Sequence, residues 1–454
     1  MKALASCIAV ASLAMTAYAQ QAVVYEGGRL IIGDGSAAIE NGAFVVQNAH
    51  ITAIGRTINP PAGAIRVNLA GKTVMPAMIN VHVHIGYEKY TSWGAQNYTA
   101  ENVLDHLQRE AFYGTAATQS VGSSPLEASL QFQRDQQSRR FPPASRFFFT
   151  PGYAPPNGGP DEVLREATKA LHVINEVSTA PEARASIQKM AGRGIKAVKI
   201  WVDDRRGTYP KMTPEVYNAI IDEAHKRGMI VHAHATTLAD QKAVVQAGAD
   251  VLVHLVQNEK LDDQYLALLR DKKPYWATVI SLGDPTAVCE HDPFFEQAMP
   301  ATVIAKIRAT MERRPLAASC GPPSPNAAAR EAILAYNFPR MIAAGARIVL
   351  GTDTGIEPGH TFGSGEHVEL ARWVQLGLTP SQAITAATQR PAELLGLKDM
   401  GTLEVGKRAS FIVLDANPLE NIRNTRIISS VYLDGARFDR EAMLARWKQA
   451  GAAQ

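Results

Sequence analysis

The feature that most constrains the fold is a regular alternation across the middle of the chain, from residue 74 to 398. Short apolar, β-branched runs alternate there with amphipathic segments of helical period. That alternation indicates parallel strands joined by helical crossovers, and therefore an α/β fold. Eight such units favour a closed (β/α)8 TIM-type barrel over an open sheet. The expected strands are residues 74–84, 115–121, 146–150, 195–201, 229–234, 250–255, 275–280 and 347–353.

Two helix boundaries are marked in the sequence. Thr213-Pro214 offers an N-cap and a proline in the first turn, and Gly228 follows the expected end of that helix. Residues 379–382 read Thr-Pro-Ser-Gln, a capping box that encloses a proline. These signals predict helices that begin near residues 214 and 380.

The two ends of the chain differ from the middle. Residues 20–73 and 399–440 contain short β-rich runs separated by turn residues, and no helical period. We therefore expect a small β-sandwich domain, built from both ends, beside a barrel of residues 74–398. Residues 441–454 are expected to form a C-terminal helix or tail.

The first 19 residues have the pattern of a secretory signal peptide. Lys2 supplies a positive start, residues 3–15 are apolar, and Ala17-Tyr18-Ala19 is a small-residue cleavage site. The apolar run is too short for a permanent membrane span. We expect cleavage after Ala19 and a periplasmic or secreted protein without a membrane partner. The alternative is a buried N-terminal strand or helix.

Composition and charge exclude some function classes. The chain has 454 residues and a formal net charge of +3, with 46% hydrophobic and 20% charged residues, which is ordinary for a globular enzyme. It has no long basic run, so nothing supports nucleic-acid binding. The expected partner is a small-molecule substrate, and self-association into a homo-oligomer is left open.

Two cysteines, Cys289 and Cys320, remain after the expected cleavage. Neither lies in a CxxC motif, which excludes a cysteine-based metal site. In an oxidising compartment they either form one disulfide or stay free, and the sequence leaves both alternatives open. Both fall in a long irregular segment, residues 281–326, that we expect to cap the barrel mouth.

Polar residues stand at the ends of five expected strands, where a barrel places its catalytic groups. In strand order they are His82 and His84, Lys199, His232 and His234, His254, and Asp353. His82 and His84 are two apart on a strand, so both point to one face as a ready pair of zinc ligands. Singly, such residues could be structural histidines, a surface lysine or a helix N-cap. Burying the whole set together costs several kcal/mol unless its members are paired or bind metal.

These residues stand in motifs whose order resembles the amidohydrolase superfamily, most closely its imidazolonepropionase-like and Xaa-Pro dipeptidase-like branch. The motifs are VMPAMINVHVH (residues 74–84), VKI (198–200), HAT (234–236), GTDTG (351–355), GTL (401–403) and GK (406–407). The resemblance covers nearly the whole mature chain. Two features depart from it: Ser410 replaces an acidic residue, and no histidine follows the third strand, in residues 150–160.

The resemblance implies a binuclear metal site, with zinc as the expected metal. Lys199 corresponds to the lysine that carbon dioxide carbamylates and that bridges the two ions. His82, His84 and Asp353 would hold one ion, and His234 and His254 the other. Asp353 would also act as the catalytic general acid and base. The implied metal ligands are therefore His82, His84, Lys199, His234, His254 and Asp353.

The fifth strand carries two histidines, and one must be chosen as the ligand. His234 lies nearer the barrel mouth and precedes Ala235-Thr236, so it is the preferred ligand. His232 shares its face but lies deeper, where it would support the ligands or face the substrate. His360 is a further candidate for such a role.

The expected reaction is hydrolysis of an amide bond, in a dipeptide or an N-acyl amino acid. A free carboxylate on the substrate would need a cation, and Arg205, Arg206 and Tyr209 follow the fourth strand at the mouth. The alternative for the two arginines is a solvated surface pair. A second reading keeps the site and changes the bond to that of a cyclic amide, lactone, ester or other xenobiotic. A non-catalytic binding barrel is a third, which predicts loss of metal ligands.

Overall fold

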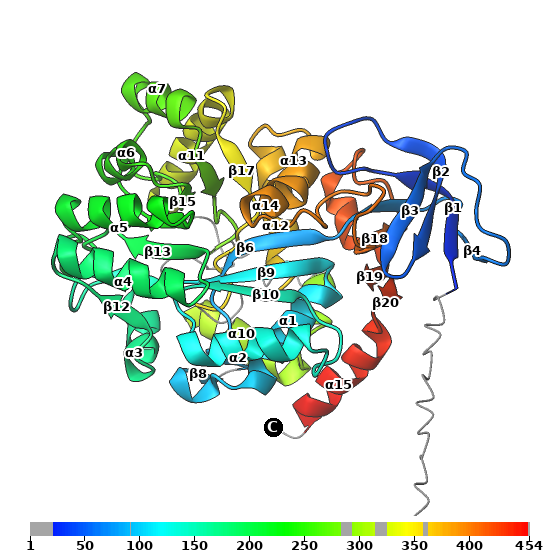
Figure 1. The fold of residues 1–454 in the computed structure, drawn as a ribbon, viewed down its shortest axis with the longest axis horizontal. Helices are drawn as coiled ribbons and strands as arrows, with labels where there is room; N and C mark the ends of the chain where they lie inside the picture. Colours follow the sequence, from blue (N-terminus) through cyan, green and yellow to red (C-terminus); the bar gives the residue numbers. More distant parts are fainter. Residues whose placement is uncertain (1–20, 91, 283–292, 314–324, 357–361, 453–454) are drawn as a thin grey trace, which may run out of the picture.

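The computed structural model describes residues 21–452, except 91, 283–292, 314–324 and 357–361. The expected signal peptide, Cys289, Cys320 and His360 fall outside the described residues. Figure 1 shows a helix-covered barrel with a smaller β-domain at one side. Among the described helices, none combines the length and apolar character needed to cross a membrane.

Both ends of the chain contribute strands to the smaller domain. They form one eight-stranded sheet in the order β20-β19-β18-β5-β1-β2-β3, with β4 paired to β1. Its strands are β1 (Val23–Leu30), β2 (Ile39–Gln47), β3 (His50–Gly55), β4 (Ile65–Asn68), β5 (Thr73–Pro76), β18 (Phe411–Leu414), β19 (Ile428–Leu433) and β20 (Ala436–Arg437). Tyr25, Phe44 and Phe411 pack at its core, with the rings of Tyr25 and Phe44 stacked at 4.8 Å. A β-domain built from both chain ends is therefore present.

The barrel consists of parallel strands. They are β6 (Met78–Val83), β9 (Thr115–Val121), β10 (Arg146–Thr150), β11 (Gly152–Ala154), β13 (Ala197–Trp201), β14 (Ile230–His234), β15 (Val251–Val253), β16 (Tyr275–Ala277) and β17 (Arg347–Val349). β10 pairs with β9 and β11 pairs with β13, so these two pieces act as one barrel strand interrupted at Pro151. Val81 N–H donates to the Leu350 carbonyl at 2.8 Å, which closes the barrel. Counted this way, the described chain has the eight predicted barrel strands.

The strand expected over residues 74–84 is in fact two strands in two sheets. β5 pairs antiparallel with β18 in the end sheet, whereas β6 pairs in parallel with β9 in the barrel. Ala77, between them, still donates to the carbonyl of Ser410 at 3.1 Å. An apolar run in the sequence does not indicate which sheet each residue joins, so the pattern predicted one strand where there are two.

The last three barrel strands are shorter than expected. β15 ends at Val253, immediately before a left-handed residue, whereas β16 and β17 end two and four residues before one. His254 has φ 70°, Val279 φ 53° and Asp353 φ 60°, all left-handed. A residue in that region cannot continue a strand, and non-glycine residues there are typical of functional sites.

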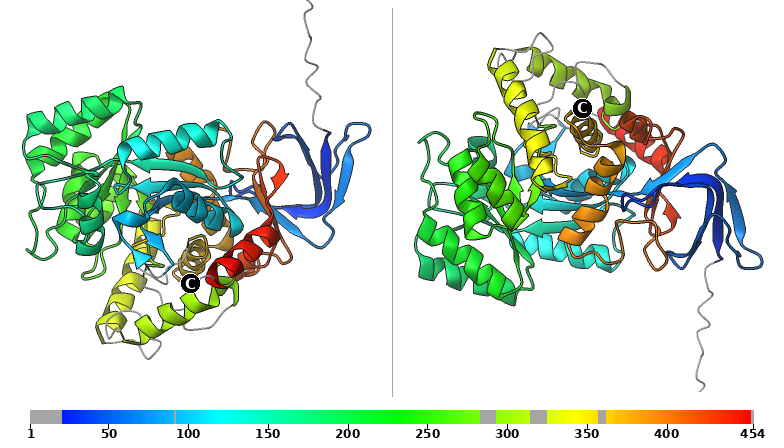
Figure 2. Two further views of the ribbon diagram at one scale, coloured as in Figure 1. Left: turned by 90° about the horizontal axis from the view of Figure 1, so that it is seen from below. Right: turned by 90° about the horizontal axis from the view of Figure 1, so that it is seen from above.

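Helices surround the barrel (Figure 2). They are α1 (Ala100–Phe112), α2 (Leu126–Gln137), α3 (Glu162–Ala170), α4 (Ala180–Gly192), α5 (Pro214–Lys226), α6 (Leu238–Ala247), α7 (Asp263–Lys272), α9 (Pro293–Glu296), α10 (Ala301–Arg313), α11 (Pro325–Ala343), α12 (Gly365–Gln375), α13 (Pro380–Ala387), α14 (Gln389–Leu394) and α15 (Arg440–Ala452). Short elements are β7 (Glu88–Lys89), β8 (Ser92–Trp93), β12 (Ile174–Glu176), η1 (Ala95–Asn97) and η2 (Ile422–Arg426). The two predicted helix starts are confirmed at α5 and α13, and α13 has the full capping box.

The described parts of segment 281–326 pack beside α1. The hydroxyl of Tyr113 donates to the Phe294 carbonyl at 2.8 Å, and Arg109 contacts the carbonyl of Ala298. Met299 packs with Tyr90, which lies between β7 and β8. A cover over the barrel mouth stays a prediction for this segment.

Candidate active site

The first barrel strand brings two histidines into the barrel. His82 and His84 are buried, with ring centroids 5.4 Å apart and ring planes at 85°. The register of β6 against β9 shifts between Asn80 and Val83, as in a β-bulge. Bulges beside active sites re-aim side chains. Nδ1 of His84 lies 2.7 Å from the hydroxyl of Ser123, which leaves its Nε2 for the interior.

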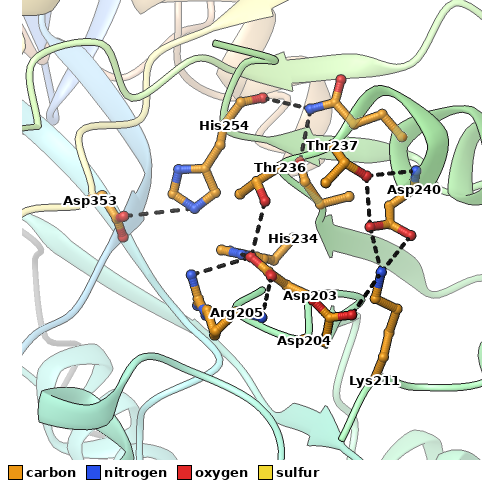
Figure 3. A network of polar contacts seen from close by, with 12 residues as sticks. Asp203, Asp204, Arg205, Lys211, His234, Thr236, Thr237, Asp240, His254 and Asp353 are labelled. Atoms are coloured by element: carbon orange, nitrogen blue, oxygen red, sulfur yellow. Dashed lines mark hydrogen bonds and ion pairs between the residues drawn. The ribbon is translucent and has the colours of Figure 1, made fainter. Parts of the chain in front are cut away.

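Asp353 stands where the chain leaves the eighth strand. Its N–H donates to the His82 carbonyl at 2.8 Å, which ties it to the first strand. Its Oδ1 lies 3.1 Å from Nε2 of His82 and 2.8 Å from Nε2 of His84. Its Oδ2 lies 3.9 Å from Nε2 of His254, a contact drawn in Figure 3. Three imidazole nitrogens therefore converge on one buried carboxylate.

Burial sets the protonation of these groups. Burial and, to a smaller extent, the charge of the nearby Lys199 together lower the pKa of His82 to about 3, against the opposing effect of Asp353. Burial also holds the pKa of His254 well below its usual value. Burial acts to raise the pKa of Asp353, but close contact with His82 and His84 holds that pKa well below its usual range. Neutral imidazoles beside an ionised carboxylate are the state in which these groups bind metal.

Lys199 lies inside the barrel, with 1% of its surface exposed and its Nζ 5.7 Å from the ring centre of Trp201. Burial lowers its pKa to about 7; the charge of Asp353 opposes this shift and that of Arg205 adds to it. A large share of this amine is therefore neutral near pH 7, the nucleophilic form of lysine. His232 is the register partner of Lys199 on β14. In the described chain neither of its ring nitrogens has a hydrogen-bond partner.

His234 and His254 form a second histidine pair, with ring centroids 4.5 Å apart. Nε2 of His234 lies 2.9 Å from Oδ2 of Asp203, so Nδ1 is the nitrogen left for a metal. The same carboxylate oxygen accepts a hydrogen bond from Thr236 at 3.1 Å and lies 3.3 Å from Arg205. Figure 3 shows Asp203 at the centre of these contacts. Asp203 therefore fixes the orientation of the His234 ring.

The donor set fits a metal ion. Over the described ranges, His82, His84 and Asp353 form a group whose ligand atoms lie within 4.8 Å of one another. Oδ1 of Asp353 is buried and has no well-oriented hydrogen bond, although two imidazole nitrogens lie within 3.1 Å. A cation among these atoms would satisfy all three, and nitrogen and carboxylate ligands suit zinc.

Comparison with known proteins identifies the family. The model described as "Amidohydrolase family" matches residues 73–437, which is most of the chain. The chain belongs to the amidohydrolase family. The match includes every strand of the barrel and the strands that the C-terminal end adds to the end sheet.

This amidohydrolase also resembles individual proteins along most of its length. Ochratoxinase of Aspergillus niger is 23% identical over 467 residues, covering 94% of this chain and 88% of that protein. Imidazolonepropionase of Deinococcus radiodurans is 24% identical over 412 residues, covering 88% and 92%. The solved structure of a Xaa-Pro dipeptidase with bound methionine has a TM-score of 0.70 at 22% identity, covering 92% and 100%. The family resemblance and the barrel fold predicted from the sequence are confirmed.

The amidohydrolase structure brings most of the predicted site residues together and separates others. The six expected ligands gather at the barrel mouth. Arg205 lies beside them, because it contacts Asp203, which in turn contacts His234. Arg206 is exposed. Tyr209 stacks under Arg165 at 3.6 Å and lines a separate surface cavity. His360 lies outside the described residues.

Sequence reasoning missed three supporting residues of the amidohydrolase site: Asp203, Ser123 and Asn80. Asp203 stands two residues after β13, and Ser123 stands two residues after β9. Both are polar residues at a strand end, the signal that identified the ligands. Asn80 lies inside a strand rather than at its end, so its position in the sequence did not mark it. Its role is visible only in its contacts with other elements.

Proposed function

We propose that this amidohydrolase is an exported enzyme with two divalent metal ions, zinc being expected, that hydrolyses the amide bond of a dipeptide or an N-acyl amino acid. The observation that carries the proposal is the convergence of three imidazoles on the Asp353 carboxylate, beside the buried amine of Lys199. Burying polar groups costs free energy unless they are paired or bind a metal, so stability of the fold does not explain this set.

The side chains fall into two groups around Lys199. His82, His84 and Asp353 would hold one ion, and His234 and His254 the other. Lys199 would stand between them as a carbamate, formed when its neutral Nζ adds to carbon dioxide and releases one proton. Metal ions in such sites lower the pKa of water toward 7 and polarise the carbonyl of the substrate.

Asp353 is the residue suited to move the proton. As an ionised carboxylate it can accept the proton of the attacking water and return it to the nitrogen of the leaving amine. Its contact with both strand-one histidines holds it beside the residues that would bind the first ion. Asp203 meanwhile keeps His234 in one orientation, so the second group of ligands does not need to rearrange.

Arg205 supports a substrate with a free carboxylate. Its side chain is 26% exposed beside Asp203, and its Nε is buried without a hydrogen-bond partner within the described structure. Arg206 points to solvent instead, so the loop after β13 presents one cation to the site. A guanidinium matches a carboxylate with two parallel hydrogen bonds. The name Xaa-Pro dipeptidase of one structural relative fits a substrate of this class.

A hydrolysis screen on the mature chain, supplied with zinc and bicarbonate, tests the proposal. Dipeptides and N-acyl amino acids would be compared with lactones, aryl esters and cyclic amides of similar size. We expect turnover of the dipeptides and N-acyl amino acids. The rate should fall when the free carboxylate of these substrates is blocked as its methyl ester. Turnover of lactones or esters alone would favour the second hypothesis, in which the same site hydrolyses a cyclic amide, lactone, ester or other xenobiotic. That hypothesis is tested beside the first because the structural relatives include proteins named molinate hydrolase and phenylurea hydrolase B.

A further inference from the structure

Behind the first barrel strand lies a pair of acids that the reaction does not use. Glu110 on α1 and Glu366 on α12 both have no exposed surface. A side-chain hydrogen bond joins them, and Thr118 approaches Glu110 at 3.4 Å. Two buried carboxyl groups in contact cost several kcal/mol of folding free energy unless they are compensated. Their position therefore calls for an explanation.

Asn80 connects this acid pair to the site. Its Nδ2 donates to Oε1 of Glu366 at 2.7 Å and to the hydroxyl of Thr352 at 2.9 Å. Its Oδ1 accepts the backbone N–H of His82 at 3.0 Å. The bulge between Asn80 and Val83 takes this N–H out of the ladder with β9, and the side chain replaces the lost partner.

The same contacts reach the eighth strand. The N–H of Thr352 donates to the His82 carbonyl at 3.0 Å, and its hydroxyl lies 2.8 Å from that of Thr354. Asp353 lies between these two threonines, and its own N–H also donates to His82. Asn80 therefore braces both strands at the point where they carry His82 and Asp353.

The acid pair holds one proton. Oε1 of Glu110 and Oε2 of Glu366 are buried without a donor from the described residues, and two carboxylate oxygens can bond each other only through a proton. Burial and the charge of Glu366 hold the pKa of Glu110 well above its usual value, whereas burial raises the pKa of Glu366 to a smaller extent. The proton therefore resides on Glu110, and Glu366 remains the acceptor for Asn80.

We propose that Glu366 is a positioning residue that acts through Asn80, fixing the β6 bulge and the end of β17 so that His82 and Asp353 meet at metal-binding distance, with Glu110 supplying the shared proton. This inference rests on the proposed metal site. Groups that support metal ligands typically contribute 10- to 100-fold in metal affinity. A group that only stabilises the fold contributes to the melting temperature and not to that affinity.

The test measures zinc affinity of the whole mature chain, by competition with a chromophoric chelator, together with the melting temperature of the metal-free protein. Glu366→Ala and Asn80→Ala should weaken zinc binding 10- to 100-fold. Glu110→Gln should keep zinc affinity within about threefold, because an amide replaces a protonated acid with the same shape and the same donor.

The matched control is His367→Gln on the same helix. His367 is equally buried and bonds Thr425 and the Tyr113 carbonyl, away from the site. It should lower the melting temperature and leave zinc affinity unchanged. Should Glu366→Ala not fold, Asn80→Ser, which keeps a hydroxyl too short to span both partners, gives the same comparison.

Unchanged zinc affinity in folded Asn80→Ala or Asn80→Ser would overturn the proposal. Equal loss in Glu110→Gln and Glu366→Ala would overturn the assignment of the proton. Since binding is measured without a substrate, a chain that binds zinc but hydrolyses no amide would refute the proposed reaction and leave this inference standing.

Discussion

At the scale of single residues, the site depends on how burial and close contacts set the protonation of its side chains. His82 is uncharged, and burial brings the pKa of Lys199 down to about 7. Asp353 stays ionised although it is buried, because His82 and His84 contact it. The roles assigned to Asp353 and Lys199 can therefore be separated by substitution, since one is a proton carrier and the other a bridge.

Asp353→Asn should lower kcat by 10²- to 10⁴-fold, the usual range for a general acid–base group, while most of the metal remains bound. An amide keeps an oxygen ligand but cannot accept and return a proton. Lys199→Ala should instead lose metal, because it removes the bridge. Paired measurements of kcat and metal content distinguish the two. A near-normal rate for fully metallated Asp353→Asn would show that another residue, such as His232, is the base.

Arg205→Met should raise KM for amides that carry a free carboxylate, lowering kcat/KM about 10- to 100-fold, the worth of a charged hydrogen bond. Their methyl esters should be little affected. Arg206→Met is the matched control, because Arg206 is the next residue of the same loop and is exposed to solvent. Equal effects of the two substitutions on both kinds of substrate would remove Arg205 from substrate recognition.

At the scale of elements, periodicity predicted the barrel strands well where one strand joins one sheet. β9 and β10 have the predicted bounds. Prediction failed at residues 74–84, where two sheets share one apolar run, and at the end of β17, which stops at Val349, four residues before the left-handed Asp353. The expected ligands could be read from their places at strand ends. Asp203 offers the same signal, because it stands two residues after β13. Asn80 offers none, because its role lies in contacts with other elements.

Gly122, just after β9, should not tolerate a side chain. Its φ is +79°, and a Cβ there would lie 2.5 Å from Cη2 of Trp201 and 2.9 Å from Cγ of Lys199. Gly122→Ala should cost about 2–5 kcal/mol of unfolding free energy from backbone strain and overpacking, and it should displace Lys199 and reduce bound metal.

Gly194→Ala is the control for that substitution. Gly194 has the same φ of +79° with no atom within 4 Å of a Cβ, so only the backbone cost of about 1–2 kcal/mol applies. Denaturant unfolding of both variants measures the difference. If Gly122→Ala is no less stable than Gly194→Ala and binds full metal, the packing around Lys199 is looser than described.

At the scale of the whole molecule, both chain ends are tied to the part of the barrel that carries the first ligands. β5 of the end sheet leads directly into β6. At the other end, Trp447 on α15 donates to Asp105 on α1 at 2.8 Å, and Arg446 bonds Gln108 and Asp105 beside it. The end domain and the last helix therefore support the strand and helix that frame His82 and His84.

Export is a proposal about the molecule as a whole. N-terminal sequencing of protein recovered from the periplasm or medium should begin at Gln20, after the Ala17-Tyr18-Ala19 site. Replacing both alanines with leucine should block cleavage. Mature protein that retains Met1 would contradict the proposal.

The binuclear site is the central claim, and metal stoichiometry tests it most directly. Purified mature chain would be stripped with a chelator, reconstituted with zinc and bicarbonate, freed of loose metal and analysed for elements. We expect about two zinc ions per chain, because two groups of ligands flank Lys199. One ion per chain would contradict the binuclear account, and no bound metal would contradict the assignment of His82, His84 and Asp353 as ligands.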